Sequence, residues 1–452
     1  WQPNEVGGHL NEDYFGGDLK GIQQKLPYLH EMGVDFIYLN PIFEAHSNHR
    51  YNTADYLNVD PLLGTNEDFE ALCTAAKKYG IGIVLDGVFS HTGSDSRYFN
   101  REGRYGEGGA YRDPNSPYRC WYDFGPQYKG GYRSWWGFET LPEVNEETPS
   151  YVEFITGPGG VIDTWLRRGA AGFRLDVADE LPDEFIEKVR AAVKRVSPEK
   201  FLLGEVWEDA TTKFGFNKRR TYLLGKGLDS VMNYPFKNAV LDFVKGKPAE
   251  QAMTEILTIC EHYPAPAMDT ALNFLSTHDT ERALTVIADE PANGRGRAWQ
   301  SGRCVTGDAY EEGLLRLRMA YAIIYTLPGV PCLYYGDEIA MQGYRDPFNR
   351  AFFRWDAHEQ RLRPVLAQLA QLRHTCEAFR TGQLRVLRAE DGILHYQRVG
   401  KVETAEIIVN RTEHIIVETL ASGKSTEVNP MGFTIVVEEV GHNPNHSYYD
   451  YV

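Results

Sequence analysis

The chain lacks an excess of basic residues. Its 452 residues include 47 Lys and Arg against 63 Asp and Glu, which gives a formal net charge of −16. Proteins that bind nucleic acids need a basic surface to neutralise phosphates, so this balance argues against nucleic acid as a partner. Long apolar runs are also missing, and no stretch approaches the roughly 20 residues that a membrane-spanning helix needs. The sequence therefore favours neither a nucleic acid nor a membrane as partner.

Paired cysteines are also missing. The six cysteines show no C-x-x-C pair and no spacing typical of a metal site. Cys332 lies in an apolar run and Cys73 in a helical pattern, which favours buried free thiols over disulfides. Free thiols are typical of a reducing compartment, so we interpret the protein as cytoplasmic. The other four cysteines are Cys120, Cys260, Cys304 and Cys376.

The N terminus has neither a start methionine nor a signal peptide, and the sequence opens with Trp1. We therefore expect that the chain has been trimmed. If the missing part included a signal peptide, secretion is the alternative to a cytoplasmic location.

Aromatic residues, in contrast, are plentiful. They make up 13% of the sequence, with 27 Tyr and 8 Trp, and many stand in polar, loop-like segments. Aromatic side chains in such segments form surfaces that suit flat, partly apolar ligands such as sugars. The hydrophobic share of 42% and the charged share of 24% are ordinary for a globular protein with a sizeable core.

Strand-like runs alternate with helical patterns over most of the chain. The runs are apolar on both faces, which is typical of parallel strands covered by helices, and the alternation predicts an α/β fold with right-handed crossovers. Strands are predicted over residues 36–40, 82–89, 172–177, 201–207, 230–236, 271–277 and 330–337. Helices are predicted over residues 18–32, 66–79, 151–168, 183–196, 311–325 and 358–377.

This pattern predicts a (β/α)8 TIM barrel. A closed barrel of this kind needs eight strands, and we count seven. We expect the first strand either upstream of Trp1 or in a segment that the sequence does not reveal.

Two further segments depart from the alternation. Residues 92–149 are rich in Gly, Tyr, Arg, Trp and Pro without a clear helix, which predicts a lid domain inserted after the third strand. Short alternating runs at 384–387, 393–398, 406–410, 414–418 and 433–437 predict an antiparallel β-sandwich. We thus expect a catalytic barrel over 1–91 and 150–378, a lid over 92–149, a sandwich over 379–440, and an unassigned tail over 441–452.

Three of the predicted strands end in a carboxylate. The segments GFRLDVADE, FLLGEVWEDA and ALNFLSTHDTER place Asp176, Glu205 and Asp279 there. The carboxyl ends of barrel strands meet on one face, where active sites lie. Like charges that gather at one place raise one another's pKa and cost stability, so such a cluster indicates chemistry.

Cleavage of a glycosidic bond needs two carboxyl groups in different protonation states. Asp176 suits the ionised nucleophile, because Arg174 lies two residues earlier on the same side of the strand and should lower the pKa of Asp176. Glu205 suits the acid, because apolar neighbours should raise its pKa by desolvation. Asp279, next to His278, could stabilise the positive charge that develops on the sugar ring. The apolar neighbours of Glu205 are Leu202, Val206 and Trp207.

Each of these residues also has a purely structural interpretation. Asp176 could be a cap or turn residue, Glu205 could belong to a strand-end ion pair, and Asp279 could cap a helix. The catalytic interpretation depends on all three carboxylates together with the neighbouring Arg and His.

With these motifs the sequence resembles the α-amylase family, glycoside hydrolase family 13, from about residue 15 to 437. The resemblance implies that Asp176 is the nucleophile, Glu205 the acid/base and Asp279 the stabiliser of the transition state. It implies that Arg174 and His278, with His91 of the motif DGVFSH, hold hydroxyl groups of the sugar that is cleaved.

Further motifs extend the resemblance to substrate binding. The segment RYNTADY resembles a tyrosine platform, so Tyr51 would stack on the same sugar, and GVPCLYYGDE fits the eighth-strand motif. RDPFNR supplies Asp346 and Arg350, which resemble residues of the next subsite, and Trp207 is a further expected substrate contact. Asp86 of DGVFSH would either touch substrate or orient Arg174, and Tyr51 and the histidines could instead be packing or hydrogen-bonded structural residues.

Details resemble one group within the family, which comprises neopullulanases, cyclomaltodextrinases and maltogenic amylases. LPEVN resembles that group's MPKLN motif with Glu143 in place of Lys, and DVADE resembles DVANE, with Glu180 where ordinary α-amylases tend to carry His. Such enzymes hydrolyse α-1,4 and often α-1,6 bonds in cyclodextrins, pullulan or maltooligosaccharides, and they retain the anomeric configuration. The resemblance therefore implies an α-glucan or maltooligosaccharide as substrate.

Two departures bear on partners and metals. The N-terminal β-domain through which that group dimerises is not seen in the sequence, so a homodimer stays open. Ser90 stands where α-amylases often use Asn to hold calcium, which predicts that this calcium site is absent. Asp18 could bind calcium near the first barrel loop, or it could cap a helix. The expected chemistry requires no cofactor, with calcium as an optional ion.

Two rival functions remain at this level. An ordinary α-amylase or α-glucosidase would share the fold and the carboxylates and differ in its products. A non-catalytic, glucan-binding or ancillary barrel protein would share the fold but usually lacks the catalytic carboxylates, whereas this chain has all three.

Overall fold

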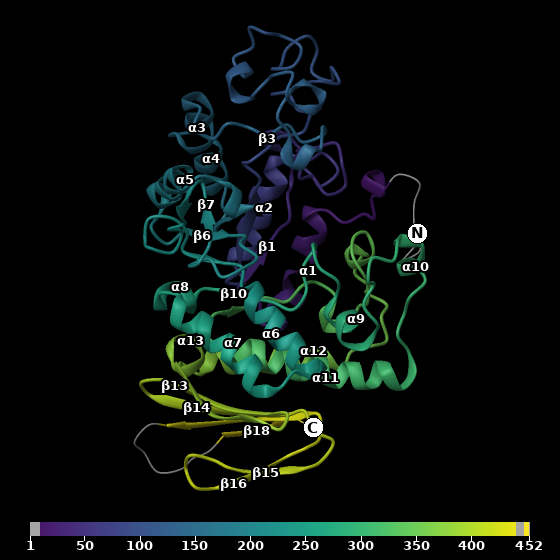
Figure 1. Ribbon diagram of the computed structural model, residues 1–452, viewed down its shortest axis with the longest axis vertical. Helices are drawn as coiled ribbons and strands as arrows, with labels where there is room; N and C mark the ends of the chain where they lie inside the picture. The colour runs from purple at the N-terminus through teal and green to yellow at the C-terminus, as the bar shows by residue number, and fades with distance from the viewer. Residues whose placement is uncertain (1–9, 440–446, 452) are drawn as a thin grey trace. The chain divides into compact units, whose positions relative to one another are not determined.

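The protein is described by a computed structural model over residues 10–439 and 447–451 (Figure 1). The chain divides into two compact units, which we call the N-terminal unit (His9–Val231) and the C-terminal unit (Met232–Val452). Among the residues described, no helix combines the length and the hydropathy that crossing a bilayer requires.

The N-terminal unit is built on a five-stranded parallel sheet in the order β1-β4-β5-β6-β9. All four residues of β5 are buried, so this strand is covered on both faces, as expected for parallel strands covered by helices. The strands are β1 (Phe36–Tyr38), β4 (Gly82–Gly87), β5 (Gly172–Leu175), β6 (Phe201–Gly204) and β9 (Ser230–Val231). Each lies inside a predicted strand.

Helices join these strands, and their ends follow local sequence signals. Helix α1 (Leu19–Glu31) begins after Asp18, whose side chain accepts a hydrogen bond from Gly21 N at 2.7 Å. Helix α2 (Asn66–Lys77) begins with a reciprocal capping box between Thr65 and Asp68. Helix α5 (Asp183–Val196) matches the predicted range.

The predicted helix over 151–168 is wrong in one respect, because it is two helices. Helix α3 (Pro149–Thr156) and helix α4 (Val161–Arg167) are separated by Gly157, Pro158, Gly159 and Gly160. Gly159 has a φ of +76°, which a continuous right-handed helix excludes. Pro158 lacks the N–H that a continuous helix would use.

Residues 92–149, for which the sequence indicates no clear helix, form loops with short 3-10 turns: η2 (Arg119–Trp121), η3 (Lys129–Gly131) and η4 (Trp135–Gly137). An aromatic cluster packs inside them, with Phe99 in ring contact with Tyr122 at 4.8 Å and Tyr132 at 4.6 Å. An isolated antiparallel β-bridge pairs the backbone of Glu143, near the end of this segment, with that of His91, which follows β4.

The C-terminal unit contains two short parallel strands, β10 (Leu272–Asn273) and β11 (Val330–Pro331), inside the last two strands predicted. The seven predicted strands are therefore all present, although several are shorter than expected. The predicted strand 230–236 ends after Val231, because Asn233 caps helix α6 (Tyr234–Lys245) by accepting from Phe236 N. The sequence analysis missed this helix.

Helices make up much of the rest of this unit. Helix α11 (Gly307–Thr326) and helix α12 (Leu362–Thr375) were expected. The others were not: α7 (Ala249–His262), α8 (Ala265–Asp269), α9 (Ala283–Ala288), α10 (Arg297–Ser301) and α13 (Ala378–Thr381).

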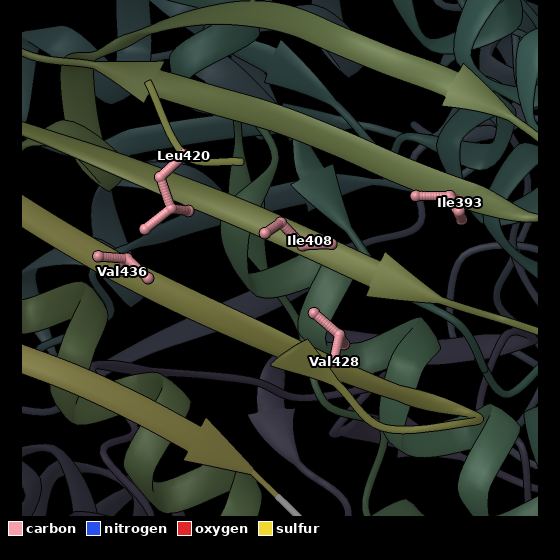
Figure 2. Packing of buried hydrophobic residues seen from close by; sticks show 5 residues of the cluster. All are labelled: Ile393, Ile408, Leu420, Val428 and Val436. Atoms are coloured by element: carbon pink, nitrogen blue, oxygen red, sulfur yellow. The ribbon is translucent and has the colours of Figure 1, made fainter. Parts of the chain in front are cut away.

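The chain ends in antiparallel sheets, as predicted. Five strands pair in the order β12-β13-β14-β17-β18, and β15 pairs with β16. Figure 2 shows the apolar core of this region, which is made of Ile393, Ile408, Leu420, Val428 and Val436. The strands are β12 (Gln383–Glu390), β13 (Ile393–Val399), β14 (Glu403–Asn410), β15 (Ile416–Thr419), β16 (Ser425–Val428), β17 (Gly432–Glu439) and β18 (Ser447–Tyr451). Strand β18 lies within the tail that sequence could not assign, whose residues 441–446 and 452 lie outside the described part.

All six cysteines are free thiols, as expected. Cys73 is buried as predicted, whereas Cys332 is only partly so.

Candidate active site

Neighbouring strands of the N-terminal unit bring the first group of candidate residues together. In the parallel register Asp86 of β4 pairs with Arg174 of β5. Asp176 and Glu205 stand one residue beyond β5 and β6, and Glu205 N donates to Leu175 O at 3.0 Å. The side chains at the carboxyl ends of three adjacent strands therefore share one edge of the sheet.

Arg174 is the centre of this group. Its Nη1 lies 2.8 Å from Asp86 Oδ1 and 2.9 Å from Asp176 Oδ1, and its Nη2 lies 2.8 Å from Glu205 Oε2. Burial alone would lower the pKa of Arg174, but the charges of Asp86 and Glu205 outweigh burial and raise it well above its usual value. One fully buried guanidinium thus contacts three carboxylates from three strands.

Asp86 is held by more than Arg174. Its Oδ2 accepts hydrogen bonds from Tyr38 at 2.7 Å and from Tyr51 at 2.8 Å. Burial raises the pKa of Tyr38 well above its usual value, so this phenol stays a donor. These contacts favour the interpretation in which Asp86 orients Arg174. The sequence analysis missed Tyr38, whose only signal is its place at the end of β1.

The surroundings of Glu205 are more polar than its neighbours in sequence suggest. Its Oε1 accepts from Trp207 Nε1 at 2.9 Å, and its Oε2 accepts from Val177 N at 2.9 Å. Val177 directly follows Asp176 and has left-handed backbone angles (φ 40°, ψ 49°), which are rare for a β-branched residue. This backbone conformation directs an N–H from the Asp176 loop to the carboxylate of Glu205.

His91 lies in the short stretch between the end of β4 at Gly87 and the 92–149 segment. Its Nε2 is 3.1 Å from Tyr51 O, and its Nδ1 is 2.9 Å from the hydroxyl of Ser90. Burial lowers the pKa of His91 to about 4, so the ring is neutral at ordinary pH. The LPEVN motif runs beside it, with Val144 N donating to Ser90 O at 3.0 Å.

The C-terminal unit holds the second group of candidate residues. His278 Nε2 lies 3.0 Å from Asp279 Oδ2, and Arg350 Nη2 lies 3.3 Å from Asp279 Oδ1. Arg350 Nε donates to His278 O at 2.9 Å and lies 3.3 Å from Asp346 Oδ1. His278, Asp279, Asp346 and Arg350 are therefore neighbours.

A buried asparagine that the sequence analysis missed holds this second group. Asn349 Nδ2 donates to His278 O at 2.7 Å and to Thr280 O at 2.8 Å. It thereby fixes the loop that carries Asp279. It lies within the RDPFNR motif, from which the sequence analysis took only Asp346 and Arg350, because its own partners lie about 70 residues away in the chain.

Asp18 has a structural role at the start of helix α1. One carboxylate oxygen of Asp18 caps helix α1, as the structural alternative predicted. Across residues 10–439 and 447–451, no three His, Cys, Asp or Glu side chains are grouped so that they could hold a metal ion.

Comparisons with known proteins cover most of the chain. The family profile described as "Alpha amylase, catalytic domain" matches residues 4–382. An amylopullulanase from Thermoanaerobacter thermohydrosulfuricus is 37% identical over 429 residues, which cover 86% of this chain and 28% of that relative. A cyclomaltodextrinase from Geobacillus thermopakistaniensis is 33% identical over 411 residues, which cover 88% of this chain and 63% of that relative. The chain thus spans less than two thirds of either relative.

A solved structure is similar over nearly the full length. The cyclic α-maltosyl-(1→6)-maltose hydrolase from Arthrobacter globiformis, in its ligand-free form, superposes with a TM-score of 0.82 at 27% sequence identity. The match covers 96% of this chain and 92% of that one. Together with the cyclomaltodextrinase match, it confirms the resemblance that the sequence motifs predict.

Proposed function

Because this chain belongs to the α-amylase family, we propose that it is a retaining α-glucan hydrolase that cleaves α-1,4 and also α-1,6 glucosidic bonds. The observation that carries the proposal is the contact of one guanidinium, Arg174, with Asp86, Asp176 and Glu205. The retaining mechanism, in which one carboxylate is the nucleophile and the other the acid, is general for this family.

The family fold is a (β/α)8 barrel with a C-terminal β domain, to which the curled parallel sheet and the antiparallel sheets correspond. Within it we assign the barrel to 1–91 and 150–378, an inserted lid to 92–149 and a sandwich to 379–440. For Asp279, His278, Asp346 and Arg350 we propose the roles that the resemblance to the family implies.

The first step forms a covalent glycosyl-enzyme. The carboxylate of Asp176 attacks the anomeric carbon, the bond to the leaving sugar oxygen breaks, and Glu205 donates its proton to that oxygen. The guanidinium of Arg174, 2.9 Å away, orients the carboxylate of Asp176 for this attack. Asp279 stabilises the positive charge that develops on the ring.

The second step releases the sugar. Glu205, now ionised, takes a proton from water, and the resulting oxygen nucleophile attacks the anomeric carbon while Asp176 leaves. Two inversions restore the original anomeric configuration. Transfer to another sugar in place of water is a side reaction of the same intermediate. Neither step requires a cofactor.

The choice of substrate class follows from the relatives. The names amylopullulanase and cyclomaltodextrinase support cyclodextrins, pullulan or maltooligosaccharides as substrates. The name of the Arthrobacter hydrolase includes a 1→6 linkage, which supports α-1,6 cleavage as well. Turnover of γ-cyclodextrin, pullulan and starch at equal mass should rank starch last, and a strong preference for starch would instead favour an ordinary α-amylase.

The catalytic assignment is tested by removing each carboxylate charge. Asp176→Asn and Glu205→Gln should each lower kcat on maltohexaose by at least about 10³-fold. Asp179→Asn and Glu208→Gln are matched controls, since these acids instead contact Lys213 at 3.0 Å and 2.6 Å, and they should keep turnover within a few-fold. Wild-type turnover by Asp176→Asn would exclude the proposed nucleophile, and a β-anomeric first product would exclude retention.

A further inference from the structure

Two consecutive tryptophans share one carboxylate in the N-terminal unit. Trp135 Nε1 donates to Glu180 Oε2 at 2.7 Å, and Trp136 Nε1 donates to Glu180 Oε1 at 2.9 Å. Both oxygens of Glu180 are therefore engaged by indole N–H groups that come from a segment about 45 residues away in the chain. This double contact fixes the orientation of both rings.

The ring of Trp136 is nevertheless directed to solvent. Trp136 is 77% exposed, the largest exposure among the large hydrophobic side chains described. Its backbone is left-handed (φ 51°, ψ 24°), which is unfavourable for a bulky residue. An exposed indole that is held in place at an unfavourable backbone conformation indicates a binding role, because folding alone gains little from it.

The position of the pair links it to the candidate active site. Glu180 ends the short 3-10 turn η5 (Ala178–Glu180), which begins two residues after Asp176. The ring of Trp135 lies 5.5 Å from the ring of His91. Trp136 is therefore linked, through Glu180 and Trp135, to the loops that carry Asp176 and His91.

We propose that the exposed face of Trp136 is a stacking surface for a glucosyl unit of the α-glucan chain beyond the bond that is cleaved. The C–H groups on a pyranose face pack against an aromatic ring, and the indole N–H is already used by Glu180, so recognition falls to the ring face. Glu180 and Trp135 act as positioning residues. This proposal rests on the proposed function for the identity of the substrate class.

Equilibrium binding tests the stacking surface without relying on turnover. In the Asp176→Asn background, calorimetric titration with maltohexaose should give a Kd about tenfold higher when Trp136→Ala is added, with a smaller change for Trp136→Phe. Maltotriose, which is too short to fill distant subsites, should lose less affinity than maltohexaose. Equal Kd values for maltohexaose with and without Trp136 would overturn the proposal.

Two controls separate stacking from a disturbed loop. Phe138→Ala removes another exposed ring of the same loop, whose centroid lies 6.1 Å from that of Trp135, and should change the maltohexaose Kd by less than about twofold. A loss as large as that of Trp136→Ala would overturn stacking in favour of loop disruption. If Asp176→Asn binds maltohexaose but wild type cleaves no α-glucan, the proposed function fails while the stacking surface stands.

Variants of Glu180 test whether it acts by positioning the tryptophan rings. Glu180→Ala should weaken maltohexaose binding, and Glu180→Gln should restore part of it, because the amide oxygen still accepts one indole hydrogen bond. The double variant Glu180→Ala/Trp136→Ala should bind no more weakly than Trp136→Ala alone, since Glu180 acts through the ring. Additive losses would overturn the positioning role.

Discussion

The guanidinium of Arg174 lies 2.8 Å from the carboxylate of Asp86, and neither side chain is accessible to solvent. The same guanidinium contacts Asp176 and Glu205. A buried charge is tolerated only when it is paired and hydrogen-bonded, so the arrangement of Asp176 and Glu205 depends on this ion pair.

Removing the cation should therefore affect stability as well as activity. Arg174→Gln leaves three carboxylates without their shared partner, and we expect a loss of about 3–5 kcal/mol in the free energy of unfolding, together with loss of activity. Urea denaturation measures the first effect and maltohexaose hydrolysis the second. Arg167→Gln removes an exposed arginine that lies 3.6 Å from the buried Asp163 on α4, and it should cost less than about 1 kcal/mol, because Asp163 keeps its contact with Arg195 at 2.7 Å. A similar small loss for Arg174→Gln would contradict the central role of the buried pair.

Tyr51 can contribute through its ring, by stacking on a sugar, or through its hydroxyl, by its hydrogen bond to Asp86. Two substitutions separate these contributions. Tyr51→Phe removes the hydrogen bond to Asp86 but keeps a ring that can stack on a sugar, whereas Tyr51→Ala removes both. We expect KM for maltotriose to rise about tenfold for Tyr51→Ala and only about twofold for Tyr51→Phe. Tyr38→Phe is the matched control for the hydroxyl, because it removes the other phenol that donates to Asp86. Equal effects of Tyr51→Phe and Tyr51→Ala would assign the role to the hydroxyl.

The sequence predicts the local part of the site well. The contact between Arg174 and Asp176 follows from their spacing of two along a strand, because alternate residues point to the same side. The seven strands are predicted because buried parallel strands are continuously apolar, a signal that needs no knowledge of distant residues. The capping role of Asp18 also depends on residues within one helical turn.

The sequence analysis fails where contacting residues lie far apart in the chain. It also fails where an apolar run fits both a strand and a helix. Tyr38, Asn349 and the Glu180 carboxylate with its two indoles act through contacts between segments tens of residues apart, which no local pattern reveals. The run 230–236 is apolar enough for a strand or a buried helix, and the cap at Asn233 decides for helix α6.

His91 should make the stability of the protein depend on acid pH. Burial lowers the pKa of His91 from 6.5 to about 4, so between these values the unfolded chain binds a proton that the folded chain does not. This stabilising contribution is present above pH 6.5 and is lost as the pH falls towards 4, by about 3 kcal/mol in total. The difference in unfolding free energy between wild type and His91→Gln, measured from pH 4 to pH 8, should change by this amount. A pH-independent difference would mean that His91 is not buried as a neutral ring.

Glu146 should produce the opposite dependence at higher pH. Burial raises the pKa of Glu146 to about 8, and the charge of Glu143 adds to the effect. Between pH 4.5 and 8 the folded chain therefore binds a proton that the unfolded chain releases, so this contribution to stability falls as the pH rises. Glu146→Gln keeps a neutral side chain at every pH, and it should be stabilising at pH 9 by on the order of 4 kcal/mol relative to its effect at pH 4.5. Thermal or urea unfolding at the two pH values measures this shift, with the exposed neighbour Glu147→Gln as a control that should show almost none. If the two variants respond alike to pH, the carboxyl of Glu146 is ionised in the folded protein, and its burial between the LPEVN motif and helix α3 does not govern its charge.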